Sequence, residues 1–326
     1  MDVSGTPESG SVRRGLLLVG HGTRYRLGQD EFLATVRQIA ERLPDWLVQP
    51  GFLELAEPTL DEAVERLVEA GATDCVVTPL LLFAAGHAKR DVPELIESAR
   101  QRYPHVNFRQ AGHLGCEPRL LALSLRRFRD ARRLIGDLGE LADLHEAGGI
   151  PAAGIPAAGD GGELGSRVET AAGGQIAPAP QDSPSLRQQV EYGDGTLLIL
   201  VGRGSLDAEA TAEMNRYAAL CGEQAGATTV RVGFVAMARP TVDEVLAEAV
   251  ETTRSVVGPN ATGGIRRVVV QPHFLFAGEL LETVRRKAMA AASAGGGEWY
   301  WAEHLGPAAE LAEAVIARTV DIASST

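Results

Sequence analysis

The chain has 326 residues, 45% of them apolar, which is enough to form the core of one large or two ordinary domains. Its formal net charge of −12 argues against a nucleic-acid partner. Its apolar runs reach roughly ten residues, well short of the ~20 that cross a membrane, and no signal-peptide pattern stands at its start, so we expect a cytoplasmic protein. The three cysteines are far apart and lack C-x-x-C spacing, which indicates neither a disulfide framework nor a thiolate metal site.

Short apolar runs alternate with helical periods in the first part of the chain. The run at residues 16–19 ends in a Gly-rich turn, which is typical of a buried strand, and apolar residues at helical spacing follow between residues 32 and 43. A second helix is expected from Pro58 to just before Gly71. Further strands are predicted near residues 47–53, 75–83 and 106–111. This alternation predicts an α/β fold with a parallel sheet and helices on both faces.

Candidate chemical groups follow three of the predicted strands. His21 comes directly after the first strand, Glu54 closes the second, and His87 follows the apolar run at residues 76–83. Because the carboxyl ends of parallel strands meet at one edge of a sheet, these groups are expected on the same edge. Two imidazoles and a carboxylate suit Co²⁺, Fe²⁺, Ni²⁺ or Zn²⁺. The alternative is that a histidine at a strand end serves only to satisfy a turn amide.

Cations gather beside both histidines. Arg24 and Arg26 follow His21, and Lys89 and Arg90 follow His87, although the chain as a whole is acidic. An anionic ligand would explain them, and so would ordinary solvated loop charge.

A long segment in the middle of the chain has a composition that cannot form a core. Residues 137–195 hold ten Asp or Glu against two Arg and are rich in Gly, Pro and Ala. Such a segment buries too little apolar surface to offset its ordering entropy. We therefore expect a disordered linker between two folded halves.

The two halves repeat each other. Residues 20–23 match residues 202–205, and residues 51–62 match residues 233–244 at the same offset of 182. The expected domains are a disordered N-terminus at 1–13, a catalytic domain at 14–136, the linker at 137–195 and a degenerate second domain at 196–322. The second domain is called degenerate because Arg203 replaces His21 and Ala236 replaces Glu54. Arg203 cannot ligate a cation but could hold a carboxylate of the substrate.

Three ordered segments, residues 18–24, 52–59 and 79–93, resemble the sirohydrochlorin chelatases of the class II chelatase family. These enzymes insert cobalt or iron in the cobalamin and siroheme pathways. The resemblance is strong over residues 14–130 and weak over residues 196–320. It implies two similar α/β domains that face each other across a cleft for a tetrapyrrole, and we expect a monomer whose halves stand in for a dimer.

The resemblance also implies roles for the candidate residues. His21 and His87 correspond to metal-binding and proton-accepting histidines, and Glu54 to an active-site carboxylate. Co²⁺ or Fe²⁺ is then a substrate, and no tightly bound cofactor is implied. Because the tetrapyrrole carries many carboxylates, the cations become candidate substrate-binding residues: Arg24, Arg26, Lys89, Arg90 and Arg203.

Two other functions are open at this point. One is a carrier that binds a metal or a tetrapyrrole without catalysis. The other is phosphoryl transfer through a histidine. Enzymes of that kind carry an Arg directly before the histidine to hold the phosphate, and here that position is Gly20, which disfavours this function. Among the other histidines, His113 and His304 occupy matching places in the two halves, which favours a structural role, whereas the role of His273 is undecided.

Overall fold

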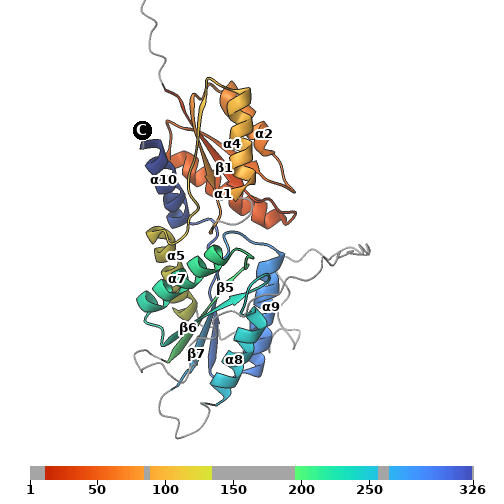
Figure 1. Cartoon of the computed structure of the whole chain (residues 1–326). Coiled ribbons are helices and arrows are strands. Elements are labelled where there is room, and N and C mark those ends of the chain that lie inside the picture. The colour runs from red at the N-terminus through yellow and green to blue at the C-terminus, as the bar shows by residue number, and fades with distance from the viewer. Residues whose placement is uncertain (1–11, 84–88, 134–194, 256–263, 325–326) are drawn as a thin grey trace, which may run out of the picture.

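The computed structural model describes residues 12–83, 89–133, 195–255 and 264–324, which form two α/β halves (Figure 1). The strands of the first half form a parallel sheet in the order β2-β1-β3-β4. Its strands are β1 (Arg14–Gly20), β2 (Leu47–Phe52), β3 (Asp74–Pro79) and β4 (Asn107–Gln110). The helices are α1 (Arg26–Arg42), α2 (Leu60–Glu69), α4 (Asp91–Arg102) and α5 (Pro118–Arg133).

The second half has the same topology. Its sheet is parallel in the order β6-β5-β7-β8. The strands are β5 (Thr196–Gly202), β6 (Thr229–Phe234), β7 (Arg267–Pro272) and β8 (Glu298–Trp301). The helices are α7 (Ala208–Ala225), α8 (Val242–Arg254), α9 (Glu279–Ala294) and α10 (Ala309–Ser324). The predicted fold class, two similar parallel sheets flanked by helices, is confirmed.

The repeated sequence segments fold alike down to single hydrogen bonds. Thr59 caps α2 and Thr241 caps α8, and each forms a reciprocal capping box with the glutamate three residues later. Each box satisfies backbone donors that the first helical turn leaves open, a contribution of about 1 kcal/mol. The cap also sets the helix start: α2 begins at Leu60 rather than at Pro58 as predicted.

Strand β3 is shorter than the predicted strand at 75–83. Its neighbour β1 ends at Gly20, and the last bond between the two segments runs from Leu80 N to Val19 O, at 2.9 Å. Beyond it, the carbonyls of Leu81 and Leu82 accept hydrogen bonds from residues 114 and 115 instead. The apolar run continues past the strand because Leu80 is buried in the packing between the halves.

The first sheet is apolar on both faces because helices cover both. Leu17 and Val19 of β1 pack with α2 and α4 on one face, while Leu16 and Leu18 pack with α1 on the other. All four side chains are fully buried. Burial of such a side chain stabilises the fold by about 1.5–3 kcal/mol, which is why a continuous apolar run, rather than an alternating one, marks these strands.

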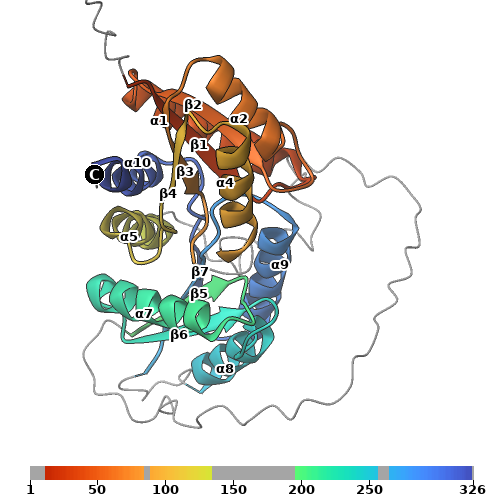
Figure 2. The ribbon, with the colours of Figure 1, turned by 45° about the horizontal axis from the view of Figure 1, so that its top comes forward.

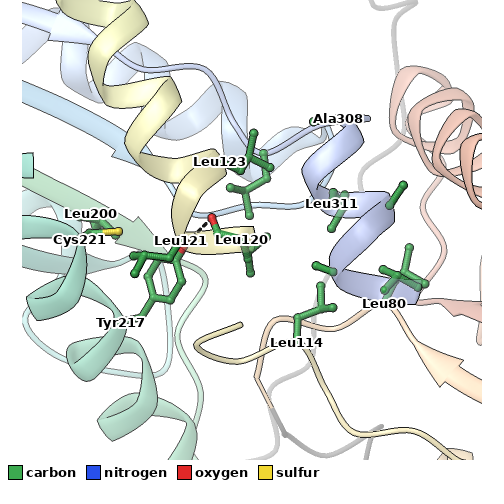
Figure 3. Packing of buried hydrophobic residues seen from close by; sticks show 14 of the residues in the cluster. Leu80, Leu114, Leu120, Leu121, Leu123, Leu200, Tyr217, Cys221, Ala308 and Leu311 are labelled. Carbon is green, nitrogen blue, oxygen red and sulfur yellow. Dashed lines mark hydrogen bonds between the residues drawn. The ribbon is translucent and has the colours of Figure 1, made fainter. Parts of the chain in front are cut away.

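The last helix of each half packs on the sheet of the other half. Helix α10 lies against β3, β4 and α1 of the first half, and α5 lies against β7, β8 and α7 of the second. The two exchanged helices lie side by side (Figures 1 and 2). The cluster of buried residues that includes Leu80, Leu120, Tyr217 and Leu311 is therefore continuous through both halves (Figure 3).

Buried polar contacts fix both exchanged helices. Thr319 of α10 and Thr78 of β3 share a hydrogen bond of 2.9 Å, and both are fully buried. On the other side, the Tyr217 hydroxyl donates to the carbonyl of Leu120 in α5, at 2.9 Å (Figure 3). It also lies 2.7 Å from the hydroxyl of Ser124. Buried polar groups are costly when unsatisfied, so these bonds select one docking position for each helix.

The expected disordered segments, 1–13 and 137–195, lie outside the described residues apart from residues 12, 13 and 195. That residues 14–136 and 196–322 are two separate domains stays a prediction.

We predict that residues 12–133, expressed alone, will not form a folded monomer. Without α10 the first sheet loses the helix that covers β3 and β4 on one face, and α5 has no sheet to cover. We expect two copies to exchange α5 and form a dimer, because that exchange restores both contacts. Light scattering after gel filtration measures the mass, with the full chain as the control. A folded monomer of the fragment would contradict this prediction.

Candidate active site

The structure brings His21 and Glu54 together at the carboxyl end of the first sheet. His21 follows β1 and Glu54 follows β2, and backbone bonds tie the two segments: Leu53 N to Gly20 O at 3.0 Å, and Glu54 N to His21 O at 3.1 Å. The imidazole Nδ1 of His21 lies 3.3 Å from Oε1 of Glu54. The side chains are 27% and 50% exposed, so a ligand can reach them.

Gly22 makes this approach possible. Its φ is +92°, and a Cβ at this position would collide with the carbonyl oxygen of Glu54. Any other residue would therefore be strained and would push the loop after β1 away from the loop after β2. Gly204 occupies the equivalent place in the second half, with a φ of +90° and the same clash with the carbonyl of Ala236.

A carboxylate beside an imidazole nitrogen has a defined chemical effect. A carboxylate that accepts a hydrogen bond from one ring nitrogen fixes the orientation and tautomer of an imidazole, as in histidines that bind metal ions. His21 with Glu54 is thus suited to bind a divalent metal or to accept a proton. Within the part of the chain that the structure describes, no cluster of three or more potential metal ligands forms. His87, the third predicted group, lies outside the described residues.

The predicted cations have different surroundings. Lys89 lies next to the second half: its Nζ is 2.6 Å from Oδ2 of Asp207 and 3.0 Å from Oε2 of Glu209. The hydrogen bonds that Lys89 donates to Asp207 and, to a lesser extent, to Glu209 raise the pKa of Lys89. Sequence reasoning missed both partners, because nothing near Asp207 indicates that it faces Lys89.

The other predicted cations are exposed near the strand ends. Arg24, Arg90 and Arg203 are exposed, and the side chain of Arg26 is 93% exposed, with Nε 3.9 Å from Asp30 Oδ2. Arg203 stands at the carboxyl end of β5, where its carbonyl accepts from Ala236 N at 2.9 Å. The backbone bond between His21 and Glu54 is thus repeated by Arg203 and Ala236 without the imidazole and the carboxylate.

Two reciprocal histidine contacts join the halves beside these loops. His113 Nε2 lies 2.8 Å from Oε2 of Glu213 in α7, and His304 Nε2 lies 3.0 Å from Oε2 of Glu31 in α1. Glu31 also accepts from the backbone N of Ala277, at 2.7 Å. These contacts agree with the structural role expected for the two histidines. The sequence held a signal for the partners, since Glu31 and Glu213 differ by the same offset of 182 as the matched motifs.

His273 is a core residue. It is 2% exposed, and its ring lies 4.3 Å from that of Tyr217 and 5.6 Å from that of Phe83, between centroids. Neither ring nitrogen has a hydrogen-bond partner. Burial lowers the pKa of His273 to about 3, so the imidazole is neutral at physiological pH. Its counterpart in the first half is Leu80, which is also buried.

We predict that His273→Leu stabilises the protein, because a leucine replaces two buried unsatisfied nitrogens, each of which costs about 1–3 kcal/mol. The pH dependence gives a second signature. Below pH 6.5 the unfolded histidine takes up a proton, whereas the folded one stays neutral down to about pH 3. Stability from this residue is therefore lost as pH falls through that window, by at most about 1.4 kcal/mol per pH unit.

Urea unfolding of wild type and His273→Leu at pH 7 and pH 5 measures both effects. We expect the variant to be more stable at pH 7, with the difference increasing at pH 5. His105→Leu, at an exposed position, is the control. A variant less stable than wild type at pH 7 would show that the imidazole stabilises this core.

The site is thus that of a two-lobed α/β protein with an imidazole and a carboxylate at the carboxyl edge of one lobe. The chain belongs to the CbiX family, whose model matches residues 15–131 and 197–322. The family resemblance predicted from the three sequence segments is confirmed.

Relatives and solved structures agree with this assignment. The chain is 26% identical to a sirohydrochlorin cobaltochelatase of Priestia megaterium over 278 residues, which are 84% of this chain and 68% of the relative. It is 25% identical to a sirohydrochlorin ferrochelatase of the same organism, over 83% of this chain and 77% of the relative. SirB from Bacillus subtilis with Fe3+ shares the fold, with a TM-score of 0.68 and 23% identity over 96% of both chains.

None of the described helices is long and apolar enough to cross a membrane.

Proposed function

We propose that this protein inserts Co²⁺ or Fe²⁺ into sirohydrochlorin. The proposal rests on one observation, the contact between His21 and Glu54 at the carboxyl edge of a CbiX-family fold. The relatives named above, a cobaltochelatase and a ferrochelatase, support the reaction and leave either metal as the substrate. Cytoplasmic location and a monomeric state fit this function and stay predictions.

Metal insertion defines what the residues must do. Two pyrrole protons have to leave the macrocycle, and the ion has to lose water before it enters. A neutral imidazole can serve both needs, as a base and as a transient ligand. His21 takes this role in our proposal, and Glu54, 3.3 Å away, orients the ring and stabilises the imidazolium that forms. We propose that His87 supplies the second imidazole, and this assignment rests on the family resemblance.

The charges assist binding of the substrate. Sirohydrochlorin is a polycarboxylate, and Arg24, Arg26, Arg90 and Arg203 are exposed cations around the two sheet edges. We propose that they bind its carboxylates. Lys89 is included in this set, but its contacts with Asp207 and Glu209 also give it a role in joining the halves.

We predict that His21→Ala folds normally and inserts metal about 10²–10⁴-fold more slowly than wild type, because it removes a base from the chemical step. The assay is anaerobic insertion of each metal into sirohydrochlorin, followed by the change in the absorption spectrum. His87→Ala is expected to behave alike.

His105→Ala serves as the matched control, since that exposed histidine lies far along the sheet from the carboxyl edge, in the loop before β4. Full activity of His21→Ala would refute its role. Wild type that binds metal in a saturable way but never changes the spectrum would be a carrier rather than a chelatase.

We further predict one specific metal site per chain. The second half has Arg203 and Ala236 in place of His21 and Glu54, and a guanidinium repels a cation. Calorimetric titration with Co²⁺ should give a stoichiometry of about one, lost in His21→Ala and kept in His273→Leu. Two equivalent sites would show that the second half also binds metal.

A further inference from the structure

Leu55 and Met237 share an unusual backbone conformation. Their φ angles are 61° and 60°, and no other non-glycine residue of the described chain has a positive φ. Left-handed backbone is unfavourable for a bulky side chain, and glycine or asparagine would adopt it more readily. Each half therefore holds a large apolar residue where its conformation is costly.

Both side chains also stay in solvent. Leu55 is 51% exposed and Met237 is 49% exposed, although the repeats bury most of their large apolar residues. Because about half of each side chain is exposed, core packing does not explain why these residues hold a strained conformation. Strain of this kind concentrates where a protein holds a side chain for a ligand.

The position of Leu55 and Met237 relates them to the proposed site. Leu55 directly follows Glu54, the partner of His21, and Met237 directly follows Ala236, which bonds to Arg203. Each therefore stands at the carboxyl edge of its own sheet. The two edges meet, since α1 contacts the loop after β7 through Glu31 and Ala277, and Lys89 contacts the start of α7.

The comparison of the halves separates binding from chemistry. The imidazole and the carboxylate of the first half are replaced in the second, but an apolar side chain with the same φ is kept at the next position. A role in proton or metal transfer would not explain its retention in a half without those groups. Contact with an apolar part of a ligand would explain it in both halves.

We propose that Leu55 and Met237 are substrate-positioning residues, each of which contacts the apolar face of the tetrapyrrole ring at the edge of its own half. This inference rests on the proposed function. The macrocycle has a planar apolar face and an anionic rim, so the exposed arginines bind the rim while these two side chains contact the face. The ring is then held over the His21–Glu54 pair.

The test is Leu55→Asn in the full chain. Asparagine is close to leucine in size and tolerates a positive φ, so the melting temperature should not fall. Binding of Co²⁺ alone should be unchanged, because His21 and Glu54 are intact. Binding of sirohydrochlorin, followed by absorption, should weaken about five-fold, the effect expected from removing a half-buried apolar contact. In Leu55→Asn, KM should rise more than kcat falls. The conservative variant Leu55→Met, which keeps an apolar side chain, should bind sirohydrochlorin like wild type.

Met237→Asn should weaken binding of sirohydrochlorin in the same way and leave Co²⁺ binding unchanged. Val12→Asn is the matched control, because Val12 is 69% exposed and precedes the amino end of β1, opposite the site. It should bind sirohydrochlorin like wild type.

The outcomes separate this inference from the function it rests on. Wild type that neither binds sirohydrochlorin nor inserts metal overturns both. Active wild type with unchanged affinity in Leu55→Asn overturns the inference alone. A Leu55→Asn variant that melts earlier or loses Co²⁺ binding also overturns it, because the strain would then serve the loop rather than the ligand. If Leu55→Asn weakens binding of sirohydrochlorin and Met237→Asn does not, the role assigned to Met237 in the second half is overturned.

Discussion

Each half of this protein depends on a helix that the other half supplies. A four-stranded parallel sheet with apolar side chains on both faces needs helices on both, and the local helices cover one face fully and the other only in part. Helix α10 completes the first sheet and α5 completes the second, through contacts such as the buried bond between Thr78 and Thr319. The exchange forces the carboxyl edges of the two sheets together, and the candidate site lies at that junction.

This arrangement allows the halves to differ in chemistry while they share a scaffold. Gly22 and Gly204 adopt the same conformation, and the same backbone bond follows each strand end. At these equivalent positions the first half has His21 and Glu54, and the second half has Arg203 and Ala236. The geometry that brings two loops together is therefore retained even where the reactive groups are absent. This supports the view that the second half contributes shape and charge to one site.

Polar groups at the junction have separate tasks. His113 and His304 each contact a glutamate of the opposite half and so fix the relative position of the sheets. His273 packs against Tyr217 and Phe83 as a neutral ring, in the place that Leu80 fills in the first half. His21 lies 3.3 Å from Glu54 of its own half, whereas the nearest carboxylate to His304, that of Glu31, belongs to the other half. Burial and partner, rather than residue type, decide which histidine is suited to chemistry.

The sequence by itself determined the local structure, the duplication and the candidate pair. Continuous apolar runs define buried parallel strands, and His21 and Glu54 follow two such strands, whose carboxyl ends share one edge of the sheet. The tertiary structure decided what depends on long-range packing. Neither the exchange of α5 and α10, nor the pairing of Lys89 with Asp207, nor the burial of His273 leaves a periodic signal. An amphipathic helix carries the same apolar stripe whichever sheet it covers, so docking against the partner half is selected by the shape and hydrogen bonds of the assembled core.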